Sequence, residues 1–438
     1  MLFSIDVLRA RKGDCLLLHY GTKSKPRLAM IDGGPSGVYK PHLKPRLRKI
    51  RTARGLDDQD PLPVDVLMVS HVDDDHIKGI LELTTEHRDL RGAQAPDLVD
   101  VTTLWHNAFD DLLDTTPGEL AKVAAGFGAA AVDHKIDVGN GDSYDAAMVL
   151  ASIPQGRDLR LDAEFLNWKV NRKFGGKLIL ATDESKPVSL GGGVKMTVVG
   201  PMKPELVALQ NKHDEWLRKN AAKTADSSAG VPAAYVDRSV PNLSSLVFLA
   251  EAGGKSMLLA GDARGDKIIK GLQLIGRLAP GSKSKMHVDL LKVPHHGSAN
   301  NLKKSFFQRI AADHYVFSGN GEHGNPERET FEMLFAARGN APFTIHLTYP
   351  IDEIDAERKE NWKKARQREL KRRAKKRTVA EKKTVKVRAA WSQTKHSLAG
   401  FLKKTPLKVG QTIRIVDHKA GHVIDLGDPL NEAWPTLA

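Results

Sequence analysis

The stretch Ser70-His71-Val72-Asp73-Asp74-Asp75-His76 sets the interpretation of the whole chain, because it puts two histidines and three aspartates on one turn. Residues 64–69 before it are rich in β-branched side chains and predict a buried strand. Residues 77–83 after it predict the start of a helix. Imidazole and carboxylate groups hold zinc and similar cations in hydrolytic sites. Without a partner the carboxylates would repel one another, and a divalent cation removes that repulsion.

A simpler interpretation of this stretch is a solvated acidic turn with a helix cap, and a single aspartate would favour it. Five metal-binding groups within six residues, with a strand before them and a helix after them, favour a metal site instead. Other polar groups also follow predicted strands. They are Asp32, His106, Asp262 and the neighbouring pair His295 and His296. Ligands at strand ends on one edge of a sheet converge, so we expect these groups to meet.

Composition limits the class of protein. The chain has 438 residues, of which 41% are hydrophobic, which is typical of a globular protein with a sizeable core. No apolar run approaches the roughly 20 residues that a membrane span needs, so we expect no membrane partner. Cys15 is the only cysteine, which excludes an intrachain disulfide. A reducing cytoplasm is therefore the simplest compartment.

The positive charge of the chain is concentrated in one segment. The formal charge is +14, and residues 358–388 alone contain 16 Lys/Arg and 3 Asp/Glu. A smaller basic cluster at residues 40–54 contains no acid. Basic segments of this kind bind nucleic acid or nucleotides in some proteins and form a solvated face in others. Both interpretations remain open for each segment.

The order of these motifs resembles the metallo-β-lactamase fold superfamily. That order is a strand, His-x-Asp-x-Asp-His, a distant histidine, a strand ending in Gly-Asp and a strand ending in histidine. Within the superfamily, several strings resemble the hydrolase domain of ComEC competence proteins. These are Lys12-Gly13-Asp14, Ile31-Asp32-Gly33-Gly34, Leu258-Leu259-Ala260-Gly261-Asp262 and Leu291-Lys292-Val293-Pro294-His295-His296-Gly297-Ser298. The matches span residues 1 to about 347, and His-His-Gly-Ser after an apolar strand is the most discriminating of them.

The resemblance implies an α/β fold, the metallo-β-lactamase αββα sandwich, in which two mixed sheets are flanked by helices. This hydrolase domain would occupy residues 1–350, with an insertion at about 135–240. Residues 351–438 would add a basic helix and a small C-terminal hairpin, for which residues 411–426 are the candidate. The membrane-spanning helices of ComEC proteins have no counterpart in this sequence.

The resemblance also implies a site with two divalent metal ions. One would be held by His71, Asp73 and a third histidine, for which His106 is the candidate. The other would be held by Asp75, His76 and either His295 or His296, and Asp262 would bridge the two. Asp75, His71 and His76 would be the catalytic residues, and Asp75 would also orient the nucleophile. Zinc is the expected metal, and the carboxylate of Asp73, where the superfamily more often has histidine, leaves manganese or iron open.

The activity implied is hydrolysis of phosphodiesters by a nuclease or nucleotide phosphodiesterase, in which the two cations activate a water molecule. Three alternatives remain at this stage. The first is a metallohydrolase of small esters, lactones or lactams. The second is a partner-docking protein whose C-terminal basic helix binds another protein, and the third is a sensor that binds a nucleotide without turnover.

Overall fold

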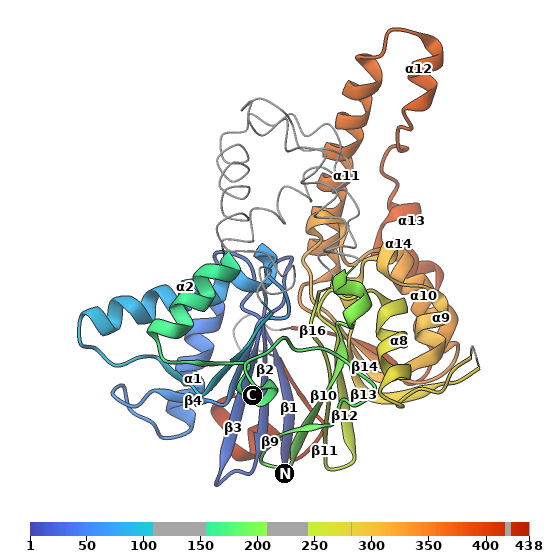
Figure 1. Cartoon of the computed structure of the whole chain (residues 1–438). Helices are drawn as coiled ribbons and strands as arrows, with labels where there is room; N and C mark the ends of the chain where they lie inside the picture. Colours follow the sequence, from blue (N-terminus) through green and yellow to red (C-terminus); the bar gives the residue numbers. More distant parts are fainter. Residues whose placement is uncertain (108–154, 208–243, 282, 417–421, 438) are drawn as a thin grey trace.

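The computed structural model describes residues 1–107, 155–207, 244–281, 283–416 and 422–437. Two large mixed β-sheets pack face to face at the centre of the protein, with helices on the outer side of each (Figure 1). The predicted α/β class with two mixed sheets is therefore confirmed. About half of the insertion predicted at about 135–240, residues 135–154 and 208–240, lies outside the described residues. None of the helices in the described part of the chain is long and apolar enough to cross a membrane.

The first sheet has seven strands in the order β17-β1-β2-β3-β5-β7-β8. The strands are β1 (Leu2–Val7), β2 (Leu16–Gly21), β3 (Pro26–Ile31), β5 (Val66–Met68), β7 (Thr103–Trp105), β8 (Lys169–Val170) and β17 (Val423–Asp425). β3, β5, β7 and β8 run parallel to one another. The carboxyl ends of these strands therefore share one edge of the sheet.

The second sheet has eight strands in the order β16-β15-β14-β13-β12-β11-β10-β9. They are β9 (Val188–Gly191), β10 (Val194–Gly200), β11 (Val247–Ala252), β12 (Lys255–Leu259), β13 (Met286–Lys292), β14 (Ile310–Phe317), β15 (Phe343–Leu347) and β16 (Gln411–Ile415). β12 to β16 are all parallel, so their carboxyl ends also lie at one edge. A separate two-stranded sheet joins β4 (Leu62–Val64) and β6 (Val99–Val101).

Alternating side chains divide the core into three clusters. In β2, Leu16 and Leu18 point into the cluster between the two sheets, whereas Leu17 points to the outer side. This is the two-residue period of a strand that is buried on both faces. Between the sheets, Trp105 stacks on Phe248 with ring centroids 5.1 Å apart. The remaining two clusters fix the helices against the outer faces of the sheets.

The outer face of the first sheet is covered by α1 (Lys44–Ala53) and α2 (Asp74–Gly92). That of the second sheet is covered by α8 (Gly265–Leu274), α9 (Lys304–Arg309), α10 (Arg328–Arg338) and α14 (Leu398–Lys404). Further α-helices of the described residues are α11 (Ile351–Ala374), α12 (Val379–Thr384), α13 (Gln393–His396) and α15 (Leu430–Ala433). The basic C-terminal extension is thus helical over α11, and a division of the chain at residue 350 stays a prediction.

The predicted hairpin at residues 411–426 is wrong. β16 pairs in parallel with β15 in the second sheet, whereas β17 pairs antiparallel with β1 in the first sheet. The two segments carry the alternation expected of strands, and each covers the otherwise open edge of a different sheet. The predicted turn at residues 418–421 lies outside the described residues.

Candidate metal centre

The turn at residues 70–76 is held against two other segments by close backbone contacts. A Cβ atom on Gly79 would lie 1.9 Å from the carbonyl oxygen of Gly33, so the end of β3 can touch the first turns of α2 only because glycine is present. A Cβ atom on Gly13 would likewise lie 1.8 Å from the carbonyl oxygen of Asp75. The loop before β2 and the end of β3 therefore both pack on the His/Asp turn.

The structure brings together most of the residues that the sequence predicted. In one group, Asp75, His76, Asp262 and His296 each offer a ligand atom, and these atoms lie within 4.8 Å of one another. Two further groups meet the same limit, His71 with Asp73 and Asp75, and Asp14 with Asp32 and His76. Asp75 belongs to two groups and His76 to two, so the three groups form one continuous cluster. This cluster could hold metal ions.

His76 is oriented by a buried carboxylate. Its Nδ1 atom lies 2.8 Å from Oδ2 of Asp32, and its Nε2 atom lies 3.3 Å from Oδ1 of Asp262. Asp32 is itself fixed, because it accepts hydrogen bonds from the backbone N–H and the hydroxyl of Ser70. A proton on Nδ1 leaves the Nε2 lone pair directed at Asp262. This is the arrangement in which a carboxylate positions a metal-binding histidine.

His296 repeats this arrangement with another carboxylate. Its Nδ1 atom lies 3.3 Å from Oδ1 of Asp14, and its Nε2 atom lies 3.4 Å from Oδ1 of Asp262 and 3.6 Å from Oδ2 of Asp75. Asp14 is also paired with the ammonium group of the buried Lys292. That ammonium group lies 3.9 Å from Asp262 as well and donates to the carbonyl of Gly261.

His71 and Asp73 form a group with Asp75, and the ring of His71 lies next to that of His76, with centroids 4.1 Å apart. Nε2 of His71 is 3.6 Å from Oδ2 of Asp73. Asp73 occupies the N-cap position of α2, but its side chain makes no capping hydrogen bond. The simpler interpretation of the turn as a helix cap therefore does not account for Asp73. Its Oδ1 atom is buried without a hydrogen-bond partner.

The structure distinguishes His295 from His296. His296 belongs to the four-residue group, whereas His295 belongs to none of the three groups found among the described residues. Nε2 of His295 still lies 3.6 Å from Oδ2 of Asp262, and Nδ1 of His295 lies 2.8 Å from the side-chain amide nitrogen of Asn301. Both histidines have left-handed backbone conformations, with φ of 48° and 52°. Two such residues in succession are unusual outside glycine and typical of functional sites.

His106 is buried at the end of β7, as predicted, but the described residues give it no place in the three groups. Burial lowers the pKa of its imidazole to about 3, and the charge of Arg160 adds to this effect. The imidazole is therefore neutral at physiological pH, which a metal ligand must be. Its role as the third histidine stays a prediction.

The electrostatics of the cluster favour positive charge. Burial opposes ionisation of His76 and His296, but the carboxylates of Asp262 and Asp32 raise the pKa of His76 well above its usual value. Asp262 and Asp14 raise the pKa of His296 in the same way. Burial would raise the pKa of Asp262, yet the charges on His296 and His76 lower it well below the usual range. A cluster of carboxylates that stabilises positive charge so strongly is suited to bind a metal cation.

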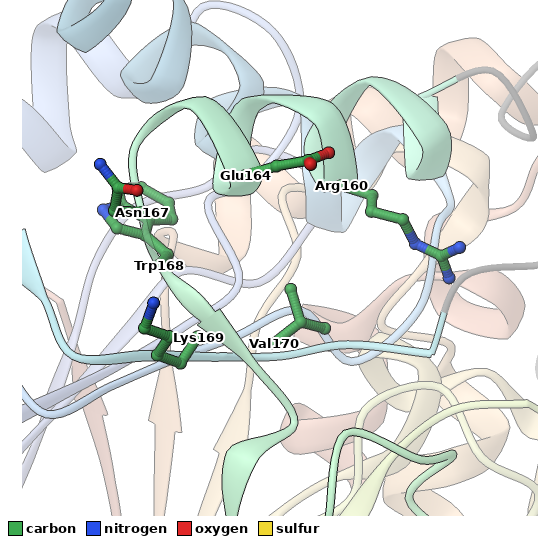
Figure 2. Close-up of a pocket in the computed structure, with 6 residues that line it drawn as sticks. All are labelled: Arg160, Glu164, Asn167, Trp168, Lys169 and Val170. Carbon is green, nitrogen blue, oxygen red and sulfur yellow. The ribbon is translucent and has the colours of Figure 1, made fainter.

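A hollow lined by six residues lies away from the His/Asp cluster. It is formed by the helix at residues 155–165 and by β8, and Figure 2 shows the six side chains that line it. None of them belongs to the His/Asp cluster.

No model of a known protein family matches the chain, and no curated protein is matched with it either.

Sequence reasoning missed two members of the cluster, Asp14 and Lys292. Asp14 stood in the Lys-Gly-Asp string, but nothing in the string indicates that the loop before β2 reaches Asp75. Lys292 had a clearer signal in the sequence, because it is a lysine at the end of the apolar strand β13. The structure buries it to 1% exposure, and a buried charge needs a partner.

Proposed function

We propose that this chain is a hydrolase of the metallo-β-lactamase type that cleaves phosphodiester bonds at a centre of two divalent cations. One observation carries the proposal: two buried histidines have carboxylates on their Nδ1 sides, and their Nε2 atoms converge on Asp262. The two Nε2 atoms and Oδ1 of Asp262 are buried without hydrogen-bond partners. Buried polar atoms are rarely left without a partner, and a cation would supply one to all three.

The donor set fits two cations. Asp75, His76 and His296 would hold one, together with Oδ1 of Asp262. His71 and Asp73 would hold the other, with a third histidine that is either His106 or His295. The second oxygen of Asp262, which lies near His295, would make this aspartate the bridge between them.

Mixed imidazole and carboxylate ligands suit zinc, and they leave manganese or iron open. When bound, such a pair of cations lowers the pKa of a water molecule and neutralises charge on the attacked phosphate. The side chains of this protein do the rest. Asp32 and Asp14 hold His76 and His296 in one orientation, and Asp75 is placed to orient the attacking water, because its carboxylate adjoins both ligand groups.

The fold supports the same assignment. Two mixed sheets packed face to face, with helices on both outer sides and the cluster at the carboxyl ends of their parallel strands, are what the resemblance implies. The cluster combines residues that follow β3, β5, β12 and β13, so both sheets contribute to it.

The test combines metal analysis with turnover of bis-p-nitrophenyl phosphate. We expect purified wild-type protein to contain a transition metal and to hydrolyse the diester, and we expect Asp262→Ala to lose turnover. Asp313→Ala is the matched control, because Asp313 is an exposed aspartate on β14 that pairs with His287. Far-ultraviolet circular dichroism would show that both variants are folded. Wild-type protein that takes up no metal when supplemented and shows no turnover would overturn the proposal.

A further inference from the structure

We propose that an arm formed by residues 351–392 binds the phosphate backbone of nucleic acid and makes the centre act on long polymers. The inference rests on the proposed phosphodiesterase function. The arm consists of α11, α12 and the segment 385–392, which returns along α11, and it projects well beyond the sheets (Figure 1).

The arm starts at the same edge of the second sheet as the metal centre. β12, β13, β14 and β15 are parallel, so whatever follows each of them emerges at one edge. β12 is followed by Asp262, β13 by His295 and His296, and β15 by α11. Adjacent strands lie about 4.8 Å apart, which puts the root of the arm roughly 10 Å from the strand that carries His296.

The root is also fixed to the loop at residues 318–327, which follows β14, the strand between β13 and β15. Arg358 of α11 donates a hydrogen bond of 3.1 Å to the carbonyl of Gly324. A Cβ atom on Gly321 would lie 2.3 Å from the carbonyl oxygen of Ile354, so the loop packs directly on the helix. The same loop carries His323, whose Nε2 atom lies 3.1 Å from Nζ of Lys12. Lys12 precedes Gly13, which packs on the Asp75 backbone, so a short series of contacts connects the root of the arm to the centre.

The arm is held in one shape by its own contacts. The indole of Trp362 donates to the carbonyl of Ala389, and Nε of Arg366 donates to the carbonyl of Arg388. Trp362 also stacks on His396, with ring centroids 4.2 Å apart. These contacts fasten the returning segment to α11. The stacking on His396 also ties the arm to α13 at its base.

The surface of the arm suits phosphate groups better than a protein partner. Glu369 is paired with Arg388, and Glu360 is paired with Lys363, so these two acids do not offset the remaining cations. From Lys371 to Val379 every residue is exposed. Only Leu370 and Val379 are exposed large hydrophobic residues in the described part of the arm. A helix that docks on a protein needs an apolar stripe, and this one has none.

The second basic segment, residues 40–54, does not offer a comparable surface. Arg46 is buried and pairs with Asp6 at 2.6 Å, and Lys44 pairs with Glu86 at 2.6 Å. Arg51 is also buried and pairs with Asp58. These cations act within the protein, which is why the proposal commits to the arm.

The geometry sets a length for the substrate. α11 has 24 residues, which at a rise of about 1.5 Å per residue makes a helix of about 36 Å. Base pairs of a duplex rise by about 3.4 Å, so a duplex that reaches from the root to the far end of α11 has about ten pairs. Shorter substrates would meet the centre without filling the arm.

The experiment compares two fourfold lysine and arginine replacements of equal charge change. The arm variant carries Lys371→Gln, Arg373→Gln, Lys375→Gln and Lys376→Gln. The control variant carries Lys23→Gln, Lys25→Gln, Lys173→Gln and Lys195→Gln, which are exposed residues on the body of the protein. Binding of labelled 6-, 12- and 24-pair DNA and RNA duplexes is measured by fluorescence anisotropy between 0.05 and 0.3 M salt, with Asp262→Ala added to prevent cleavage. Turnover of bis-p-nitrophenyl phosphate is measured with Asp262 intact.

We expect the arm variant to bind the 24-pair duplex at least 10-fold more weakly at low salt, whereas the control variant stays within about twofold of wild type. The slope of log affinity against log salt should fall by about 3 to 4 in the arm variant only, at roughly 0.9 per phosphate contact. Wild-type affinity should rise between the 6-pair and 12-pair duplexes, and small-diester turnover should be the same in all three proteins.

Equal duplex binding by the arm variant and wild type would overturn the proposal. So would specific capture of an acidic protein through the arm with no duplex binding. Duplex binding that depends on the arm in a protein without diesterase activity would refute the proposed function but leave the binding surface intact.

Discussion

Among the described residues, histidines gather both in the candidate metal centre and around the buried His346, and the two groups differ in their surroundings. In the candidate metal centre, His76 and His296 have carboxylates on both sides, and these raise their pKa values well above normal. In the second group, His346 lies between His314 and His422, with nitrogen–nitrogen distances of 3.0 Å and 2.6 Å. Burial and these two neighbours lower the pKa of His346 to about 2.

The difference shows that clustered imidazoles do not by themselves make a cation site. The ring nitrogens of His346 are hydrogen-bonded to the two other histidines, whereas Nε2 of His76 and of His296 have no hydrogen-bond partner. Among the described residues, the groups able to hold a metal include no member of the second group. Carboxylates that orient the rings and lower the cost of positive charge are what distinguish the centre.

The comparison is tested most strongly by removing one histidine from each group. We expect His76→Ala to lose bound metal and to lower kcat/KM for bis-p-nitrophenyl phosphate by about 1,000-fold or more, since the cations supply several kcal/mol of transition-state stabilisation. His346→Ala should keep the metal content and turnover of wild type after correction for folded protein. Metal analysis and steady-state kinetics provide the measurements, and metal loss in His346→Ala would contradict the distinction.

Lys292 tests whether positive charge is required within the centre. Lys292→Met leaves the buried Asp14 and Asp262 without their ammonium partner, which should lower the free energy of unfolding of the metal-free protein by about 3–5 kcal/mol. Added zinc should restore more stability in the variant than in wild type, because the cation replaces the lost charge. Lys255→Met is the control. The half-exposed Lys255 pairs with Asp289, and its loss should cost less than about 1 kcal/mol.

Urea unfolding with and without zinc measures all three proteins. If zinc stabilises wild type and Lys292→Met by the same amount, the ammonium group of Lys292 and the metal cation do not stabilise the same carboxylates.

Asp32 is not itself a predicted metal ligand, so replacing it tests whether its carboxylate must orient His76 for metal binding. Asp32→Asn should weaken metal binding by roughly 10–100-fold, the usual effect of removing such a partner. Asp97→Asn is matched to it, because Asp97 lies 3.8 Å from the buried His87 outside the centre. Competition with a chelator measures the affinities. Equal affinity in Asp32→Asn and wild type would show that His76 needs no such support.

The sequence predicted the parts of this centre that are local. His71, Asp73, Asp75 and His76 lie within six residues, and Asp262 and the pair His295 and His296 each follow an apolar strand, although the sequence does not choose between these two histidines. Asp14 and Lys292 could not be assigned in this way, because their contacts arise from the packing of a loop and a strand on distant residues. The hairpin at 411–426 failed for the same reason, since local alternation predicts a strand but does not determine which strand it pairs with.

A further expected effect concerns the pH dependence of the second histidine group. In the unfolded chain His346 titrates near its normal pKa of about 6.5, and in the folded protein its pKa is lowered to about 2. Below pH 6.5 the unfolded chain therefore binds a proton that the folded chain does not bind. The stability that neutral His346 contributes is present above pH 6.5 and is lost as the pH falls, by up to about 1.4 kcal/mol per pH unit.

His346→Asn removes this titration, so the difference in unfolding free energy between wild type and the variant should shrink as the pH falls from 7 to 5. Urea unfolding of the metal-free proteins at several pH values measures that difference. His76, whose pKa is raised, has the opposite sign: its contribution is present below pH 6.5 and is lost as the pH rises through the raised pKa. A difference between wild type and His346→Asn that does not change with pH would mean that the two groups of histidines do not differ electrostatically as described.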